Sequence, residues 1–359
     1  MGRAAPGPGV TPLHDQLARQ IRSTGPITIA EYMAVALTHP TYGYYTTRNP
    51  LGVDFTTAPE VSQMFGELLG LSLAGAWLDA GAPSPFVLAE LGPGRGTLMA
   101  DALRATHKVP GFHAAAQIHL VEVSPSLRAA QAKALAGADP TWVDQVADLP
   151  DVPLFVIANE FFDALPIRQF LRDGPGWRER VVGVGHDALV FGLTDAAPIA
   201  GLDDDPTQDG NLVQTCAAAE AIMAEVARRI STHGGTALII DYGDTQITGD
   251  TFQAIHAGQK SDPLAHPGAA DLTAHVDFGA LSRAARAAGA GVHGPVAQGR
   301  LLKRLGIELR AAALAKTATD PRMIDAAHLR LTDPAEMGDL FKAIAVTPPD
   351  TAAPPGFAP

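Results

Sequence analysis

The stretch Phe86-Val-Leu-Ala-Glu-Leu-Gly-Pro-Gly-Arg-Gly-Thr97 decides the fold of this chain. Its apolar start is typical of a strand buried on both faces of a sheet, and Glu90 follows where that strand would leave the core. Three glycines then leave the backbone of a tight loop bare for a ligand: Gly92, Gly94 and Gly96. The residues after Thr97 predict a helix whose first N–H groups face this loop. Strand, bare loop and helix N-terminus together predict a nucleotide-type site.

The spacing of the glycines narrows the kind of nucleotide. The dinucleotide pattern G-x-G-x-x-G needs its third glycine one residue later, and the phosphate-binding P-loop needs a lysine that this loop lacks. Glu90 would repel a pyrophosphate but suits a cation, so the loop predicts S-adenosylmethionine, which carries a sulfonium and an ammonium. The next strand, expected over 117–123, ends near Glu122, which we expect to bind a ribose diol. The alternative for Glu122 is a solvated charge at the end of a strand.

Composition limits the function classes. The chain has 359 residues, 47% of them hydrophobic and 18% charged, which is typical of a soluble globular protein of two or three units. A net charge of −12 disfavours nucleic acid as a partner, because such binding depends on Lys and Arg contacts to phosphates. The sequence has no apolar run long enough to predict a membrane span. Its histidine spacings match no metal-ligand pattern, and its one cysteine, Cys216, is expected on a helix face as a small buried residue.

The pattern along the chain predicts six segments. Residues 1–10 form a flexible N-terminus without the apolar core of a secretory signal, and 11–85 form a helical region with box-like helix starts at Thr28 and Thr57. Residues 86–165 and 234–346 form the two parts of an α/β core. Between them, 166–233 form an inserted antiparallel β-meander followed by a helix from Val213 to Ile230. Residues 347–359 are expected to be a disordered tail.

The core strands are expected over 86–90, 117–123, 154–158 and 237–241. Helical stretches lie between the first three strands, at 97–107 and 125–136, and this alternation predicts a doubly wound, mostly parallel sheet. Ligands of such sheets bind outside the carboxyl ends of the strands. That rule gathers the polar residues at the strand ends around one crevice: Glu90, Glu122, Asn159, Glu160 and Asp241.

Several longer motifs resemble the MidA family of class I methyltransferases, whose mitochondrial members are complex I assembly factors. The match spans roughly Leu13 to Val346. Its motifs are, in order, Pro40-Thr-Tyr-Gly-Tyr-Tyr45, Asp54-Phe-Thr-Thr-Ala-Pro-Glu-Val-Ser-Gln63, Phe65-Gly-Glu67, Glu90 to Thr97, Ala158-Asn-Glu-Phe-Phe-Asp-Ala-Leu-Pro166, Asp241-Tyr-Gly243, Asp271-Leu-Thr-Ala-His-Val-Asp-Phe278, Gln298-Gly299 and Leu305-Gly306-Ile307. The resemblance implies a Rossmann-like, mostly parallel sheet with an N-terminal helical region and an inserted substrate-side subdomain. It also implies dependence on S-adenosylmethionine and methylation of a protein arginine, in mitochondrial members on a subunit of NADH:ubiquinone oxidoreductase. The chain departs from the family at Asn49–Asp54, where Val53 replaces a common glycine.

Catalytic roles are assigned around the strand that ends at 158. We expect Glu160 to orient the acceptor guanidinium and Asp163 to assist, although Asp163 could instead cap the following turn. Asn159 could line the cofactor site or receive a substrate amino group. His275 could line the active site or be an ordinary loop histidine. Pro59, Glu60 and Ser62 could close over the cofactor or act in helix capping alone.

Other functions stay open at this point. The competitors are a methyltransferase for a small molecule or RNA, a non-catalytic assembly chaperone that keeps a cofactor pocket, and a nicotinamide dehydrogenase, which the loop spacing disfavours. We expect a protein acceptor and a cytoplasmic location for a bacterial chain, or the mitochondrial matrix for a eukaryotic one. The acceptor protein, the number of methyl groups and the oligomeric state, including a homodimer, are not specified by the sequence.

Overall fold

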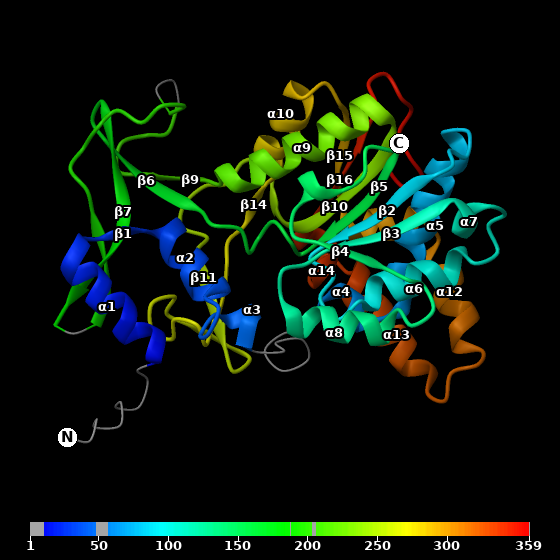
Figure 1. Ribbon diagram of the computed structural model, residues 1–359, viewed down its shortest axis with the longest axis horizontal. Coiled ribbons are helices and arrows are strands. Elements are labelled where there is room, and N and C mark those ends of the chain that lie inside the picture. Colours follow the sequence, from blue (N-terminus) through cyan, green and yellow to red (C-terminus); the bar gives the residue numbers. More distant parts are fainter. Residues whose placement is uncertain (1–10, 48–56, 187, 203–205, 359) are drawn as a thin grey trace. The chain divides into compact units, whose positions relative to one another are not determined.

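The computed structural model describes residues 11–47, 57–186, 188–202 and 206–358 (Figure 1). The chain forms two compact units. We call the first the meander unit; it consists of Met1–Phe55, Ala164–Ala218 and Gln246–His275. The second, the core unit, consists of Thr56–Asp163, Ala219–Thr245 and Val276–Pro359. The expected flexible N-terminus and the Asn49–Asp54 loop both lie outside the described residues.

The core unit is built on the predicted mostly parallel sheet. Its strands follow the order β15-β16-β10-β5-β2-β3-β4. The parallel strands are β2 (Phe86–Leu91), β3 (Ala116–Val121), β4 (Thr141–Val143), β5 (Leu154–Asn159) and β10 (Gly235–Asp244). The antiparallel strands are β15 (Gly291–Ala297) and β16 (Phe341–Thr347). On one side of the sheet β2 is followed by β3 and β4, and on the other side β5 is followed by β10. The strand order therefore reverses between the neighbours β2 and β5. The α/β fold class is confirmed.

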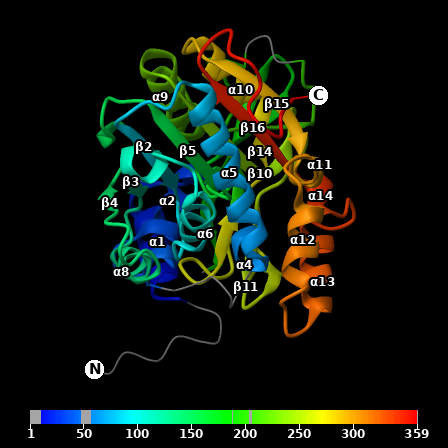
Figure 2. The ribbon, with the colours of Figure 1, turned by 90° about the vertical axis from the view of Figure 1, so that its right-hand side faces the viewer.

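Helices cover this sheet, and its inner strands are buried as expected. In Figure 1, α9 (Ala217–His233) and α10 (Phe278–Ala287) lie above the strands, and α6 (Thr97–Thr106) and α8 (Pro125–Ala134) lie below them. All residues of β2 and β5 are buried. Long α5 (Gln63–Asp79) packs along α6. Two further helices, α12 (Ile307–Ala315) and α13 (Pro321–Thr332), pack against each other (Figure 2).

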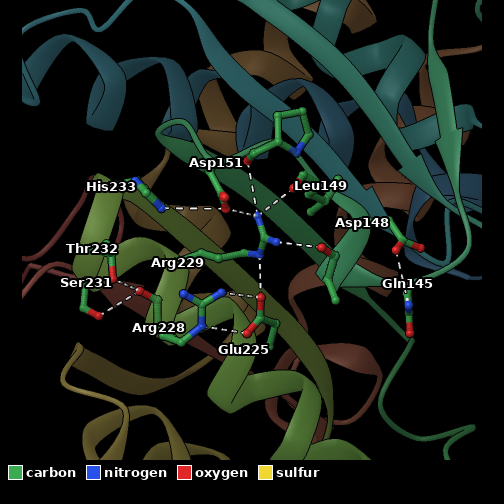
Figure 3. Close-up of polar contacts among 12 residues, drawn as sticks. Gln145, Asp148, Leu149, Asp151, Glu225, Arg228, Arg229, Ser231, Thr232 and His233 are labelled. Atoms are coloured by element: carbon green, nitrogen blue, oxygen red, sulfur yellow. Dashed lines mark hydrogen bonds and ion pairs between the residues drawn. The ribbon is translucent and has the colours of Figure 1, made fainter.

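One buried arginine joins α9 to the segment that leads into β5 (Figure 3). The Arg229 guanidinium donates hydrogen bonds to the carbonyls of Leu149 (2.8 Å), Pro150 (3.2 Å) and Ala147 (2.8 Å). Its Nε donates to Glu225 Oε1 at 2.7 Å. A buried guanidinium is tolerated because its donors are satisfied in this way. The contacts fix the helix against the start of the strand whose far end carries Asn159.

The meander unit contains the predicted antiparallel strands. Strands β6 (Arg168–Asp173), β7 (Gly176–Gly185) and β8 (Ala188–Leu193) pair as β6-β7 and β7-β8. The predicted start of the following helix at Val213 is wrong, because β9 (Leu212–Thr215) pairs with β6 and the helix begins at Ala217. Cys216 therefore lies between strand and helix, where its Sγ donates to the carbonyl of Pro166 at 3.3 Å.

The expected helical region at 11–85 is divided between the two units. Helices α1 (Pro12–Thr24), α2 (Ile29–Thr38) and α3 (Tyr44–Thr47) belong to the meander unit, and α4 (Ala58–Val61) and α5 to the core unit. The capping box of Thr28 and Glu31 forms as predicted. Among the described residues, no helix is long and apolar enough to cross a membrane.

The C-terminal segment differs from the expected disordered tail. Phe357 is buried in the core cluster, and Ser72 Oγ donates to the carbonyl of Pro355 at 2.8 Å. The segment is ordered because an aromatic side chain buries apolar area in the core cluster, which offsets the entropy of ordering a short chain end.

Candidate functional site

Two buried polar side chains flank the point where the strand order reverses. Glu90 lies near the carboxyl end of β2, and Asn159 is the last residue of β5, its parallel neighbour. Crevices at such points are where open α/β sheets bind their ligands. Glu90 Oε2 and Asn159 Oδ1 are buried, and neither atom has a hydrogen-bond partner among the described residues. Buried polar atoms are rarely left in this state, and the position of these two at the reversal of the strand order makes them candidates for ligand contacts.

The electrostatic state of Glu90 follows from its burial. Removal from water raises the pKa of this carboxyl to about 8, against a smaller opposing effect from the backbone N–H of Met99. A cation placed beside Glu90 would favour the ionised form and lower that pKa. The site therefore favours a positively charged group near Oε2.

The glycine loop has the geometry that the sequence predicts. All three glycines adopt positive φ, with +63° at Gly92, +53° at Gly94 and +85° at Gly96. A Cβ on Gly92 would lie 2.8 Å from Cδ2 of Phe161, on the loop after β5. Gly92 therefore allows two loops from neighbouring strands to approach more closely than any other residue would.

A glutamine connects the glycine loop to Glu122. Gln131 on α8 is fully buried, and its Nε2 donates to the carbonyl of Gly94 (2.8 Å) and to Glu122 Oε2 (3.2 Å). Its Oε1 accepts from Trp142 Nε1 at 2.8 Å. Glu122 Oε1 also accepts from the backbone N–H of Ser124 at 2.7 Å, and burial raises the pKa of Glu122. The carboxylate at the end of β3 is therefore held in one orientation beside the loop.

The loop after β5 begins with a strained residue. Glu160 has φ +50°, a left-handed conformation that a residue with a side chain seldom adopts. Its Oε1 accepts from Asn159 Nδ2 and from the backbone N–H of Ala58, both at 3.1 Å. Strain of this kind is often retained where a side chain must point in one functional direction.

A buried carboxylate on β10 shapes the rest of this loop. Asp241 Oδ2 accepts from the backbone N–H groups of Phe162 (3.0 Å) and Asp163 (3.2 Å), and Oδ1 accepts from that of Tyr242 (2.9 Å). Burial, together with the negative charges of Asp163 and Glu160, raises the pKa of Asp241 well above its ordinary value. The core unit thus concentrates acidic groups at the carboxyl ends of β5 and β10.

The segment that includes Pro59 and Ser62 forms a short helix and a second helix start. Pro59 lies in α4, and Ser62 Oγ accepts from the backbone N–H of Met64 at the start of α5. The predicted capping box at Thr57 is not formed, because the Thr57 side chain makes no capping bond. Glu60 instead accepts from Arg95 in the glycine loop and from Thr97.

His275 belongs to the meander unit and is the last residue of its final segment. Its backbone N–H donates to Thr251 Oγ1 at 3.1 Å, and its carbonyl accepts from Gln214 Nε2 at 3.1 Å. Burial lowers the pKa of this imidazole. Within the described part of the chain, no group of three or more His, Cys, Asp or Glu residues could hold a metal ion.

The core unit thus gathers most of the predicted site residues, and it adds two that were missed in their present role. The role of Gln131 could not be predicted from the sequence, because the sequence does not show which distant residues a glutamine on a helix contacts. The sequence leaves Glu60 either closing over the cofactor or capping a helix, and it does not indicate the contact with the glycine loop, because the partners of Glu60 lie 35 and 37 residues further along the chain.

Comparisons with known proteins bear on this site. The family model described as "Putative S-adenosyl-L-methionine-dependent methyltransferase" matches residues 68–296. The Bos taurus protein arginine methyltransferase NDUFAF7, mitochondrial, is 38% identical over 94% of this chain and 84% of its own length. Its Drosophila melanogaster homolog is 39% identical over 95% and 86%. A Burkholderia thailandensis protein, solved with S-adenosyl-homocysteine bound, superposes with a TM-score of 0.84 at 30% identity, covering 99% of this chain and 98% of that one.

Proposed function

The chain belongs to this family of S-adenosyl-L-methionine-dependent methyltransferases, and on that premise we propose that it methylates an arginine side chain of a protein. The enzyme class and the cofactor follow from the family. The arginine acceptor and the residues that act on it are the proposal. The relatives' names support it, since the matching proteins from Bos taurus and Drosophila melanogaster are named protein arginine methyltransferases.

The core unit offers a donor set that fits the cofactor. When bound, S-adenosylmethionine supplies an electrophilic methyl group on a sulfonium centre. Glu90 Oε2 and Asn159 Oδ1 are acceptors without partners among the described residues, which suits the ammonium of a methionine moiety. Glu122 is oriented to accept from a ribose diol, and the glycine loop leaves room for close backbone approach. We assign cofactor binding to these residues and to Gly92, Gly94 and Gly96.

The observation that carries the arginine proposal is the acidic cluster at the ends of β5 and β10. Glu160, Asp163 and Asp241 lie close enough that the first two raise the pKa of the third. Such a cluster is costly unless a cation neutralises it, and a planar guanidinium is the side chain best matched to paired carboxylates. An amide or hydroxyl acceptor brings no positive charge to this cluster.

The work left to the protein is to position the acceptor. The nitrogen that gains the methyl group loses one proton, which a carboxylate of the acidic cluster takes up. An arginine guanidinium has a pKa above about 12, so a carboxylate must hold its charge away from the reacting nitrogen. We assign this to Glu160, whose orientation is fixed by Ala58 N–H and Asn159 Nδ2. Asp163 is placed on the same loop as a second acceptor for the guanidinium, and Asp241 orients that loop. Alignment of the two reactants accounts for the remaining rate gain.

Three finer assignments belong to the same proposal. His275 is kept as a residue that assists at the acceptor side, and Pro59 and Ser62 as residues near the cofactor. The resemblance to the MidA family suggests a subunit of NADH:ubiquinone oxidoreductase as the acceptor. The relatives are named as mitochondrial proteins, which agrees with the mitochondrial option and gives no support to the cytoplasmic one.

A methyl-transfer assay that offers protein, RNA and small-molecule acceptors together tests the proposal. The purified chain is incubated with S-adenosylmethionine labelled in its methyl group and a lysate that lacks the enzyme, and label is counted in protein, RNA and small molecules. We expect label in protein, lost with Glu160→Gln and retained with Glu308→Gln, a matched change at an exposed site on α12. Label confined to RNA or metabolites would overturn the protein acceptor. Full turnover by Glu160→Gln with intact cofactor binding would overturn the role of Glu160.

A further inference from the structure

The short helix α4 contacts both motifs of the site within the core unit. At its start, the backbone N–H of Ala58 donates to Glu160 Oε1 at 3.1 Å. Two residues later, Glu60 accepts from Arg95, the central residue of the glycine loop, and from Thr97, the first residue of α6. One turn of helix therefore joins the loop that binds the cofactor to the carboxylate assigned to the acceptor.

The contact between Glu60 and the glycine loop is specific in geometry. Arg95 donates through two nitrogens, from Nη2 to Glu60 Oε2 at 2.6 Å and from Nε to Oε1 at 3.4 Å. Thr97 Oγ1 donates to the same Oε1 at 2.7 Å. The Glu60 side chain is 18% exposed and that of Arg95 34%. A partly buried, two-pronged pair restricts the guanidinium plane, and with it the Gly94-Arg95-Gly96 backbone, more than a surface ion pair would.

Glu60 is not needed to build the helix that carries it. Thr57, three residues before it, makes no side-chain capping bond, so no capping box exists for Glu60 to complete. Among the described residues, the three hydrogen bonds of its side chain all go to residues 95 and 97. The side chain therefore serves the glycine loop.

We propose that Glu60 is a positioning residue for methyl transfer, which fixes the glycine loop through Arg95 and Thr97 and holds Ala58 N–H against Glu160. This inference rests on the proposed function, because it assigns the loop to the cofactor and Glu160 to the acceptor. Its consequence is that a change at Glu60 alters both cofactor affinity and turnover. A purely structural pair would alter stability alone.

The test compares two Glu–Arg pairs of similar chemistry. Glu179 in the meander unit accepts from Arg168 through two nitrogens, at 2.7 and 2.6 Å, and its side chain is 11% exposed. Glu60→Gln and Glu179→Gln are compared by thermal unfolding, by calorimetric Kd for S-adenosyl-homocysteine, and by hydrogen exchange of residues 92–97. We expect Glu60→Gln to raise that Kd about tenfold, to speed exchange of the loop and to lower kcat, since charge-assisted bonds are lost. Glu179→Gln should leave the Kd and the exchange unchanged.

A second pair of variants keeps the inference falsifiable if Glu60→Gln does not fold. Arg95→Gln removes the same pair from the other side and should raise the Kd similarly, and the charge exchange of Glu60→Arg with Arg95→Glu should recover part of the loss. An unchanged Kd and kcat in Glu60→Gln and Arg95→Gln, or a change in thermal stability alone, would overturn the role of Glu60. The Kd for S-adenosyl-homocysteine and the hydrogen exchange of residues 92–97 do not depend on the acceptor. They can therefore fail while methylarginine still forms, and they can hold while the label is found in another acceptor.

Discussion

Glu90 and Asn159 stand near the ends of adjacent parallel strands, and each keeps one buried oxygen that no described residue hydrogen-bonds. The two residues lie on either side of the point where the strand order reverses, 69 positions apart in the chain. Leaving two such acceptors without partners costs free energy in the folded chain. In the site that we propose, this cost is recovered when the ammonium of the cofactor donates hydrogen bonds to both oxygens.

Replacing Glu90 should weaken cofactor binding without weakening the empty protein. Glu90→Gln keeps the shape but removes the charge, and loss of a charge-assisted hydrogen bond of about 1.5–3 kcal/mol corresponds to roughly 10- to 100-fold in Kd. Calorimetry with S-adenosyl-homocysteine measures this, with Glu308→Gln as the exposed control. An unchanged Kd would show that Glu90 does not contact the cofactor.

Binding of the cofactor should release a proton near neutral pH. Burial raises the pKa of Glu90 from 4.5 to about 8, and a bound cation favours the ionised carboxylate. Affinity should therefore rise from about pH 6 to about pH 8 and level off above it. Calorimetry in two buffers of different ionisation enthalpy counts the proton. Glu90→Gln should abolish its release, and equal release by both proteins would contradict the assignment.

The raised pKa of Glu90 also affects the stability of the empty protein. Stability falls with rising pH, whereas cofactor affinity rises. Because the folded-state pKa of Glu90 lies above the unfolded value, the folded chain holds a proton that the unfolded chain has lost between pH 4.5 and about 8. The contribution of Glu90 to stability is present below pH 4.5 and is lost as the pH rises through about 8. The unfolding temperature of the empty protein should therefore fall more steeply with rising pH in the wild type than in Glu90→Gln. Parallel curves would contradict this.

The close approach at Gly92 can be separated from its backbone conformation. Gly92→Ala places a Cβ 2.8 Å from Phe161, whereas Gly174→Ala introduces a Cβ at φ +56°, close to the +63° of Gly92, with nothing within 4 Å. Both should lose roughly 1–2 kcal/mol from backbone strain. Gly92→Ala should lose more and should also raise the cofactor Kd, since Phe161 and the neighbouring Glu160 must shift. Denaturant unfolding and calorimetry measure the two effects. Equal behaviour of the two variants would show that Phe161 yields freely.

Gln131 should set the orientation of Glu122. Gln131→Glu keeps an acceptor for Trp142, but it removes both N–H bonds and places a second carboxylate beside Glu122. Gln131→Met removes the bonds without adding charge. We expect the cofactor Kd to rise in both, and more in Gln131→Glu, because like charges repel in a buried site. Kd values in the reverse order would contradict the role given to Glu122.

The sequence predicts the parts of this fold that local patterns determine. Strand β2 and its loop are visible because a fully buried strand is continuously apolar and a bare loop needs glycines. The Thr28 capping box is likewise a contact over three residues. Most of the residues that we propose for cofactor binding follow from these patterns, since carboxyl ends of parallel strands meet at one edge.

The remainder depends on partners distant in the chain. The amide of Gln131 is assigned its role by Gly94 and Glu122, and the carboxylate of Glu60 by Arg95. The sequence predicts a helix that includes the residues of β9, because the Ala-rich run after Cys216 favours a helix. These residues form a strand because they pair with β6. Phe357 is ordered by a tertiary contact that a proline-rich tail does not reveal.

The identity of the methylated amino acid tests the central claim most directly. The protein fraction labelled from S-adenosylmethionine is hydrolysed to amino acids, which are separated and identified by mass spectrometry. The account predicts that the label resides in methylated arginine and that Glu160→Gln removes it. Label in methyl-lysine, in a methylated amide or in a base-labile methyl ester would contradict the assignment of arginine. A lysine ammonium is a point charge that does not match paired carboxylates as a planar guanidinium does, and an amide or carboxylate acceptor brings no cation to the cluster around Asp241.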